Sequence, residues 1–344
     1  MRVLVTGMIA GMNDQQYIDD VVEMGQKDNL LIDSFNLIER LEKRNKTLAR
    51  MLGTTNYLFE VLREREYAKI GFELQKTLCK NALIRVPATI QWNHINFKLK
   101  DHKEVAEFLE PDVIVTLIDA EWSIRQNISS MKPKDQFQRT IQQDDFSIRE
   151  ILTWMNEEVS LAEDWAKHLG VKHYIIPIAQ GPESLYKLVK YPDIPSFYVS
   201  YSMTHSDEPT RKEINKTIEQ LNEYGLVIDP QAIEIGDHYE TEKDKQATFS
   251  YTVHRDLHWF VGKVDAIVAI HPYANRPPLS TGMMDELGHA RDYLKKRYMI
   301  FPHPKQSPFT TDSYIDKGRI VASSNELFIC LEAEGIRKMS EEIH

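Results

Sequence analysis

Two acidic residues in the last third of the chain have the type and the setting needed for acid–base chemistry. Asp256 opens the apolar segment DLHWFVGKV, and Glu286 follows Ser280 and Thr281, either of which is a suitable helix N-cap. Two carboxylates at one pocket can cleave a glycosidic bond, because one attacks or stabilises the anomeric carbon while the other handles a proton. Acidic residues are also ordinary in the first turn of a helix, so the spacing by itself leaves both interpretations open.

The segments around these carboxylates predict how both reach one crevice. Residues 265–270, DAIVAI, form a short apolar run typical of a strand buried in a parallel sheet. Residues 197–202, FYVSYS, predict a second strand, which is followed by a helical pattern that ends at Gly225. The carboxyl ends of parallel strands meet at one edge of a sheet, and ligands bind there. These elements can therefore direct Asp256 and Glu286 toward the same crevice.

The motifs in the C-terminal part of the chain resemble those of a known family. The segment DLHW…VDAIVAI…LSTGMMDELGHA resembles the 2'-deoxynucleoside 5'-monophosphate N-glycosidases, which are relatives of the nucleoside 2-deoxyribosyltransferases, over most of residues 196–330. The resemblance implies that Glu286 is the nucleophile, that Asp256 assists as an acid/base or orienting group, and that Ser280 binds a 5'-phosphate. Deoxyribosyltransferases of free nucleosides usually carry Asp at the position of Ser280, so the serine favours a phosphorylated substrate.

The same resemblance implies further site residues. Tyr198 of the first strand would lie in the pocket and is counted with the catalytic residues. The residues that the resemblance assigns to the substrate and its phosphate are Ser280, Gly282, Ser200, Ser202 and Thr204. Two departures are clear: Tyr201 and Thr204 replace the family's usual Gly and Arg, and the loop 271–279 is longer than the usual connection, which leaves recognition of the base open.

The activity implied is hydrolysis of the N-glycosidic bond of a (deoxy)nucleoside 5'-monophosphate, giving free base and (deoxy)ribose 5-phosphate. No cofactor and no metal are expected, because His254 and His258 stand four residues apart without the glutamate arrangement of the zincins. A homodimer or higher homo-oligomer is implied by the resemblance. The alternatives are an NAD glycohydrolase, a nucleoside deoxyribosyltransferase, and a nucleotide-sensing effector in antiphage defence.

The N-terminal half opens with the pattern of a phosphate loop. RVLVTG predicts a strand, Gly7 and Gly11 follow it, and a helical pattern comes next. A full Walker motif needs Lys and Ser/Thr where Asn13 and Asp14 stand. The strand–helix order resembles a nucleoside monophosphate kinase-type domain over roughly residues 1–190. We interpret it as a degenerate domain in which Gly7, Gly11 and Asn13 can contact a nucleotide, or else as a purely structural or dimerising domain.

Composition sets the outer limits of these interpretations. The 344 residues, 42% hydrophobic and 27% charged, suffice for two domains with real cores. A net charge of -10 argues against a nucleic-acid polymer as partner and favours a nucleotide substrate. Two cysteines are too few for a disulfide framework. No run is apolar for long enough to span a membrane, and no signal peptide opens the chain, so we expect a cytoplasmic protein.

The predicted fold class is α/β, with two doubly wound parallel-sheet, Rossmann-like domains. Apolar strand patterns that alternate with long helical stretches are the basis of this prediction. The boundary is placed in KYPDIP, residues 190–195, because two prolines stand there among polar residues. The predicted domains are therefore 1–192, resembling an adenylate kinase-like P-loop domain, and 193–344, resembling a nucleoside deoxyribosyltransferase.

Overall fold

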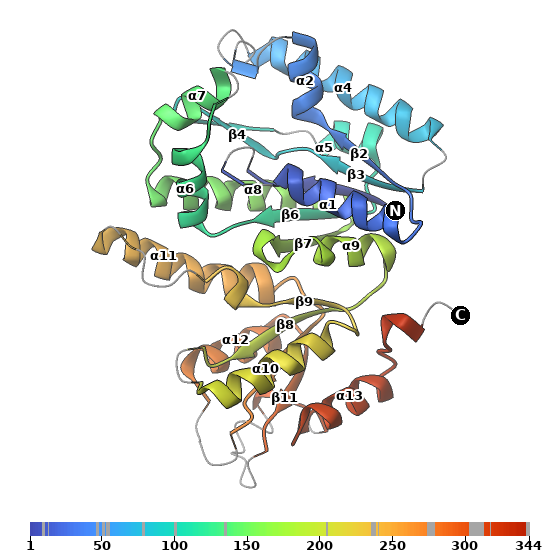
Figure 1. Cartoon of the computed structure of the whole chain (residues 1–344), viewed down its shortest axis with the longest axis vertical. Helices are drawn as coiled ribbons and strands as arrows, with labels where there is room; N and C mark the ends of the chain where they lie inside the picture. The colour runs from blue at the N-terminus through green and yellow to red at the C-terminus, as the bar shows by residue number, and fades with distance from the viewer. Residues whose placement is uncertain are drawn as a thin grey trace. The chain divides into compact units, whose positions relative to one another are not determined.

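The chain forms two compact units in the computed structural model (Figure 1). One contains Met1–Lys190 and Ile235–Tyr251, and the other contains Tyr191–Glu234 and Thr252–His344. The chain therefore leaves the first unit close to the predicted boundary, but a segment placed by the sequence in the C-terminal domain belongs to the first unit. The described residues are 1–8, 11–12, 14–45, 48–49, 52, 56–77, 80–99, 102–133, 136–203, 206–234, 239, 241–273, 279–302, 313–316 and 318–341.

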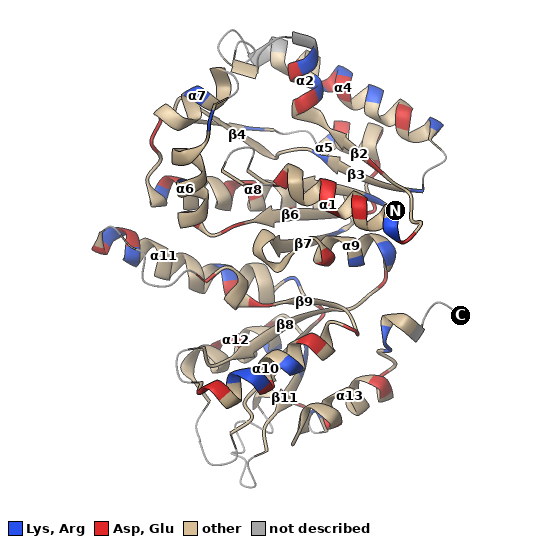
Figure 2. Ribbon diagram, viewed as in Figure 1, with Lys and Arg blue, Asp and Glu red and all other residues tan. Residues whose placement is uncertain are grey.

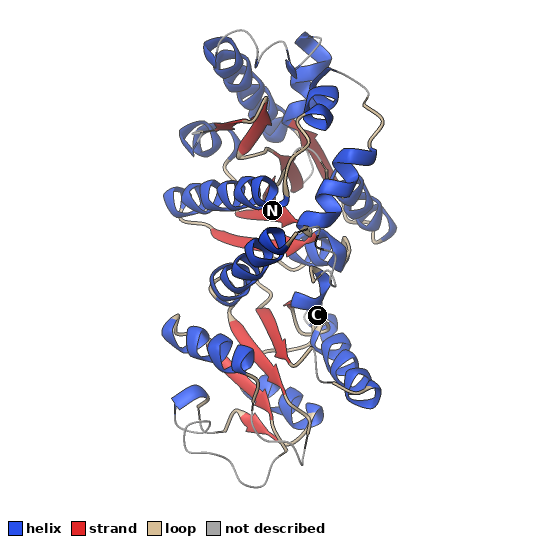
Figure 3. Ribbon diagram, turned by 90° about the vertical axis from the view of Figure 1, so that its left-hand side faces the viewer, coloured by secondary structure: helices blue, strands red, loops and turns tan. Residues whose placement is uncertain are grey.

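The first unit is built on a five-stranded sheet in which every neighbouring pair is parallel. Its strands, in spatial order, are β2 (Ile32–Asn36), β3 (Asn81–Arg85), β1 (Arg2–Thr6), β6 (Val113–Ile118) and β7 (Lys172–Pro177). The inner strands are almost wholly buried, as expected where helices cover both faces of a parallel sheet. Figure 3 shows helices on either side of these strands.

The helices of the first unit connect these strands. They are α1 (Asp14–Lys27), α2 (Leu37–Asn45), α4 (Asn56–Lys76), α5 (His102–Glu104), η1 (Val105–Leu109), α6 (Glu121–Ser130), α7 (Gln136–Gln143), α8 (Ile148–Leu169), η2 (Ile178–Gln180) and α9 (Glu183–Lys190). Helix α11 (Glu242–His254) begins in this unit and ends in the other. The longest, α8, begins at a reciprocal capping box between Ser147 and Glu150 and ends at Gly170, whose φ of 69° suits glycine.

A short antiparallel hairpin lies outside the main sheet of the first unit. It pairs β4 (Thr89–Trp92) with β5 (Ile95–Lys98). Asn93 and His94 close it with φ of 48° and 57°, the left-handed conformation that a two-residue hairpin turn requires. The sequence predicts a strand near this point but not its return partner.

The second unit repeats the parallel architecture with five strands. Their spatial order is β12 (Ile320–Val321), β11 (Lys296–Ile300), β10 (Ala266–Ile270), β8 (Ser196–Tyr201) and β9 (Leu226–Ile228). The remaining elements are α10 (Glu208–Leu221), η3 (Pro230–Ala232), η4 (Arg255–Val261), α12 (Thr281–Asp292), α13 (Ser324–Ala333) and η6 (Met339–Glu341). In Figure 2 the strands of both units are largely free of charged residues, which gather on the helices.

The two faces of the second sheet are covered by different helices. Helices α10 and α13 pack on the face that Phe197 and Val199 of β8 share with alternate residues of β10. The opposite face receives α12 and the π-helical turn η4, which also contact each other. Because side chains alternate along a strand, Tyr198 and Ser200 point toward α12. The predicted fold class, α/β with two doubly wound parallel sheets, is confirmed.

No helix among the described residues has the length and apolar character needed to cross a bilayer.

Candidate active site

The two carboxylates singled out by the sequence lie on neighbouring elements of the second unit. Glu286 is in α12, whose N-cap is Ser280; the Ser280 hydroxyl accepts a hydrogen bond from the Met283 amide at 3.3 Å. Asp256 is in η4, which packs against α12. The sequence predicted an α-helix at this point, and the π-helical form differs by one extra residue per turn. Such turns are rare in proteins overall, but where they occur they are often found at functional sites.

Glu286 is held by two hydroxyls of the central strand β8. The Tyr198 hydroxyl donates to one carboxylate oxygen at 2.7 Å, and the Ser200 hydroxyl donates to the other. Both donors follow from the two-residue period of the strand, which places them on the face covered by α12. The carboxylate is therefore fixed in orientation by partners more than eighty residues distant in the chain.

The protonation of Glu286 is set by opposing effects. Burial is the largest, and the nearby charges of Asp256 and Asp285 act in the same direction, while the hydrogen bonds from Ser200 and Tyr198 oppose them; together they raise the pKa of Glu286 to about 7. Burial and the charges of Glu286 and Asp256 raise the pKa of Tyr198 well above its usual value, so this hydroxyl stays a proton donor at neutral pH. A carboxylate poised near neutral pH is suited to attack or to proton transfer.

Asp256 is paired with a buried arginine that the sequence reasoning missed. The Arg255 side chain donates to Asp256 at 2.9 Å and to Glu234 at 2.8 Å, and Arg255 is only 2% exposed. Burial raises the pKa of Asp256, and Arg255 partly opposes that rise. The signal available in the sequence was the position of this arginine directly beside Asp256, because a buried charge needs a partner.

Aromatic packing connects the two carboxylate systems. The ring of Phe260 lies 6.2 Å from that of Tyr198, centroid to centroid, and the Arg255 guanidinium lies 5.7 Å from the Phe260 ring. The Tyr198–Glu286 pair and the Arg255–Asp256 pair thus share one packed layer between the sheet and its helices. This layer fixes the positions of two acids with different partners, which is the arrangement that acid–base catalysis requires.

The described residues among those assigned to the substrate lie at the carboxyl end of β8 and at the start of α12. Ser202 lines a cavity of about 50 Å³ together with Ser206 and Arg211. Gly282 is exposed in the first turn of α12, and a side chain built there would meet nothing within 4 Å. Thr204 and the central part of the loop 271–279 lie outside the described residues. Ser200 contacts Glu286 and so lies beside the predicted nucleophile.

In the glycine turn of the first unit, the Gly7 amide binds a carboxylate of the same unit. The Gly7 amide donates at 2.9 Å to the carboxylate of Glu158, which also accepts from the Ala88 and Thr89 amides, each at 2.7 Å. Burial raises the pKa of Glu158 to about 7, although these donors oppose the rise. The amide expected to meet a phosphate is therefore already bound to a side chain. No local pattern indicates this contact, because Glu158 stands on α8, far along the chain.

The other residues of that turn also have local explanations. Gly11 has φ of 76°, and a side chain there would come within 2.8 Å of Ile124 and Ile128 of α6. Asp14 is buried and paired with Arg85 of β3. Asn13 lies outside the described residues. The backbone at Gly11 is consequently packed against α6, and the charge of Asp14 is paired within the unit.

Histidines gather on the surface of the second unit. The rings of His254 and His289 each lie 4.8 Å from that of His258, centroid to centroid. The described part of the chain holds no group of three or more His, Cys, Asp or Glu residues arranged to bind a metal ion. The His254 ring is tilted by 44° to that of His258, and the His289 ring meets His258 edge to face at 80°.

Comparison with known proteins adds little to this geometry. No family model matches the chain. No curated protein matches it either. Among solved structures, the crystal structure of shikimate kinase from Aquifex aeolicus is similar to part of the chain, with a TM-score of 0.36 and 11% identity, covering 55% of this chain and 94% of the kinase. A likeness of that size carries no argument about function.

Proposed function

We propose that the second unit hydrolyses the N-glycosidic bond of a (deoxy)nucleoside 5'-monophosphate. The observation that carries the proposal is the half-buried Glu286 carboxylate, oriented by Tyr198 and Ser200 and poised by its pKa of about 7, next to the separately held Asp256. The resemblance of the motifs around these residues to nucleotide N-glycosidases supplies the substrate class. The donors on Glu286 fix its direction, and its raised pKa leaves an ionised fraction near neutral pH.

The reaction divides into two displacements. The Glu286 carboxylate attacks C1' of the sugar, the C1'–N bond breaks, and its electron pair leaves with the base, which takes a proton from Asp256. Water then attacks C1' of the ester, Asp256 recovers a proton from that water, and Glu286 is released as the carboxylate. The sum is one nucleotide and one water giving free base and (deoxy)ribose 5-phosphate, with no cofactor consumed.

The phosphate would be held at the carboxyl edge of the sheet. The first turn of α12 directs backbone amides toward this edge, and Ser280 and the exposed Gly282 stand there. Helix N-termini favour anions because their amides lack partners within the helix. Ser202 lies at the end of the strand that carries Tyr198 and Ser200. Glycine at 282 leaves open space for a ligand group to approach the backbone.

Release of free base tests the proposal. The protein is incubated with each ribo- and deoxyribonucleoside monophosphate and with NAD, and free base is measured by chromatography. We expect release from a monophosphate and a loss of roughly three orders of magnitude or more in Glu286→Gln, since removal of a nucleophile abolishes the covalent route. Asp292→Asn, which alters an exposed acid at the far end of α12, is the matched control and should retain most activity.

The outcomes also separate the alternative activities. Release from NAD alone would favour a glycohydrolase of dinucleotides, and release only when a second base is supplied would favour deoxyribosyl transfer. Unchanged release by Glu286→Gln would refute the nucleophile. No release from any substrate would refute the proposed activity of the protein as it exists.

A further inference from the structure

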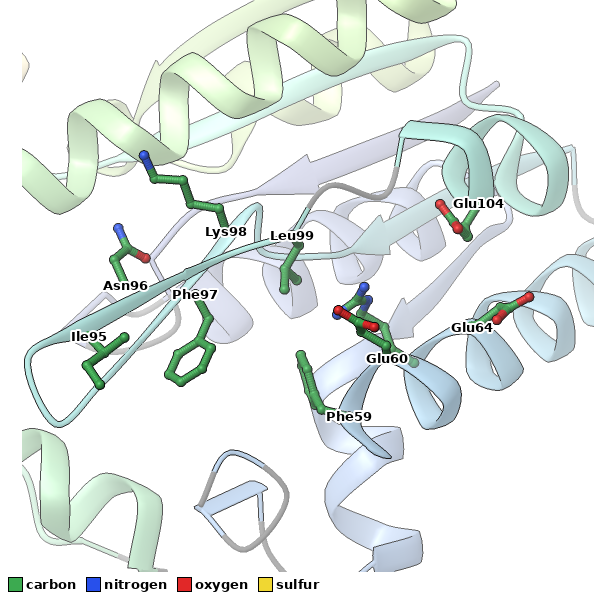
Figure 4. Close-up of a pocket in the computed structure, with 10 residues that line it drawn as sticks. Phe59, Glu60, Glu64, Ile95, Asn96, Phe97, Lys98, Leu99 and Glu104 are labelled. Atoms are coloured by element: carbon green, nitrogen blue, oxygen red, sulfur yellow. The ribbon is translucent and has the colours of Figure 1, made fainter. Parts of the chain in front are cut away.

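The first unit contains a cavity of about 620 Å³ between α4 and β5 (Figure 4). Its lining carries charges of both signs, Glu60 and Lys98 among them, beside two phenyl rings, so it favours no single class of ligand. In the second unit, by contrast, the charged groups of Glu234, Arg255 and Asp256 contact one another directly. The balance of their charges has a consequence for the proposed reaction.

Arg255 holds two carboxylates on one guanidinium. Its Nε donates to Asp256 at 2.9 Å, and its Nη2 donates to Glu234 at 2.8 Å. The three side chains differ in their contact with water: that of Arg255 is 3% exposed, that of Asp256 is 11% exposed and that of Glu234 is 33% exposed. Asp256 is therefore the more buried of the two acids, and Glu234 is the acid that water reaches.

The charges of this cluster do not cancel when both acids are ionised. Glu234 and Asp256 then carry two negative charges and Arg255 carries one positive charge, which leaves one net negative charge in a largely buried setting. Burial disfavours a net charge, and a single proton removes it. An Arg255–Asp256 pair without Glu234 would already be neutral, and a proton on it would leave the guanidinium charge uncompensated. The second acid therefore makes protonation of Asp256 favourable.

The proton belongs on Asp256 rather than on Glu234. Water stabilises an ionised carboxylate, and it reaches Glu234 far better than Asp256. Burial is the largest effect on the pKa of Asp256 and raises it, Arg255 lowers it, and the charge of Glu234 raises it again. Glu286 of α12 and Tyr198 of β8 also face Asp256, since its charge raises the pKa of both. Like-charge repulsion between Asp256 and ionised Glu286 acts in the same direction as Glu234.

We propose that Glu234 is a positioning residue that lets Asp256 carry a proton, because both acids share the Arg255 guanidinium. The inference rests on the function proposed above, in which that proton passes from Asp256 to the base nitrogen that keeps the electron pair of the broken C1'–N bond. Asp256 is then ionised against Arg255, and it takes a proton back from the water that attacks C1'. Glu234 stays ionised throughout, acts through Arg255 and transfers no proton itself.

Infrared spectroscopy measures the proton on Asp256 without any substrate. Full-length Glu286→Gln serves as the parent protein, because it lacks the other acid of the site, and the carboxylic C=O stretch that an added Asp256→Asn removes is assigned to protonated Asp256. We expect this band in the parent, and we expect it to disappear as the pH rises. An added Glu234→Gln should move the midpoint to lower pH by about one pH unit or more, because a nearby negative charge is lost. An added Glu223→Gln, which alters a surface carboxylate paired with Lys338, is the matched control and should leave the midpoint in place.

Base release from two substrates tests what the proton does. Guanine leaving dGMP needs a proton, whereas the base of 7-methyl-dGMP already carries a positive charge and departs as a neutral molecule without one. In otherwise wild-type protein, Glu234→Gln should lower kcat/KM for dGMP about tenfold or more above the midpoint, because the protonated fraction of Asp256 falls tenfold for each pH unit. The value for 7-methyl-dGMP should stay within about threefold of the wild type. A residue that only supports the fold would lower both values equally.

Three results would overturn the inference. They are the absence of a protonated Asp256 band in the folded parent at every pH, a midpoint that Glu234→Gln leaves in place, and equal losses of kcat/KM for the two substrates. Failure of the proposed function looks different, because no monophosphate would then release base while the midpoint in Glu234→Gln still moved; that result would support the link between Glu234 and the proton. Circular dichroism checks folding, and Glu234→Ala provides a second variant that lacks the same charge.

Discussion

Removing the Tyr198 hydroxyl should change the protonation of Glu286 while leaving both carboxylates in place. In Tyr198→Phe the ring still packs against Phe260, but the donor 2.7 Å from the Glu286 carboxylate is gone. That donor stabilises the ionised form, so its loss must raise the pKa of Glu286 further above the wild-type value of about 7. Less of the nucleophile is then ionised at neutral pH, and base release should slow.

The size of this effect follows from the strength of one charged hydrogen bond. Such a bond contributes roughly 1.5–3 kcal/mol, and one pKa unit corresponds to about 1.36 kcal/mol, so the pKa of Glu286 should rise by about one to two units. With the wild-type carboxylate about half ionised at pH 7, activity at that pH should fall between about fivefold and about fiftyfold. Above the new pKa the two proteins should converge.

The assay is kcat/KM for base release as a function of pH. The acid limb for the wild type should lie near pH 7 and should move to higher pH in Tyr198→Phe. Tyr201→Phe is the matched control, because Tyr201 lies on the same strand but donates to Asp229 at 2.8 Å. Both variants use the same substrate, so ionisation of its phosphate cancels. An acid limb that stays in place or moves to lower pH would refute the role of Glu286 as the titrating nucleophile.

Three further predictions concern stability, measured by urea unfolding. Because folding raises the pKa of Glu286 from 4.5 to about 7, the wild-type protein loses stability as pH rises through that range. The free energy of unfolding of Glu286→Gln, relative to that of the wild type, should therefore increase by up to about 3 kcal/mol between pH 5 and 8.5. A difference that stays constant over this range would contradict the prediction. Glu158→Gln should lower the free energy of unfolding by about 2–4 kcal/mol, because one oxygen that accepts hydrogen bonds is replaced by an NH2 group that cannot. The change Glu163→Gln on the same helix should lower it by less than about 0.5 kcal/mol. Arg255→Met should cost about 3–5 kcal/mol by leaving Asp256 buried without its cation, and a cost near zero would show that the pair contributes little.

Short-range patterns were sufficient for the elements that carry the candidate site. The β-rich run FYVSYS and the apolar run DAIVAI predicted β8 and β10, and the N-cap of α12 is Ser280, one of the two residues that the sequence offered for it. These features depend on backbone propensity and on side-chain period within a few residues, which the sequence displays directly. The same reasoning explains why the α/β class and the parallel sheets were predicted correctly.

Patterns of this kind do not show which groups meet across a sheet. The Glu286 carboxylate meets Ser200 and Tyr198 only because α12 packs over β8, and Arg255 meets Glu234 only because the folded chain brings Glu234 to η4. A contact of this type depends on strand order and on which face a helix covers, and neither is written in local periodicity.

The strands β8 and β10 and the start of α12 follow from the amino-acid sequence without any knowledge of packing, and the sequence also singles out Asp256 and Glu286 as the candidate acids. The protonation of these acids does not, because burial dominates the pKa of Glu286 and burial exists only in the folded chain. Folding also brings the Gly7 amide to Glu158, and it places Phe59, Phe97 and Glu104 around one cavity. All of these contacts depend on long-range packing, because packing determines both how far a polar group is removed from water and which hydrogen-bond partners it meets.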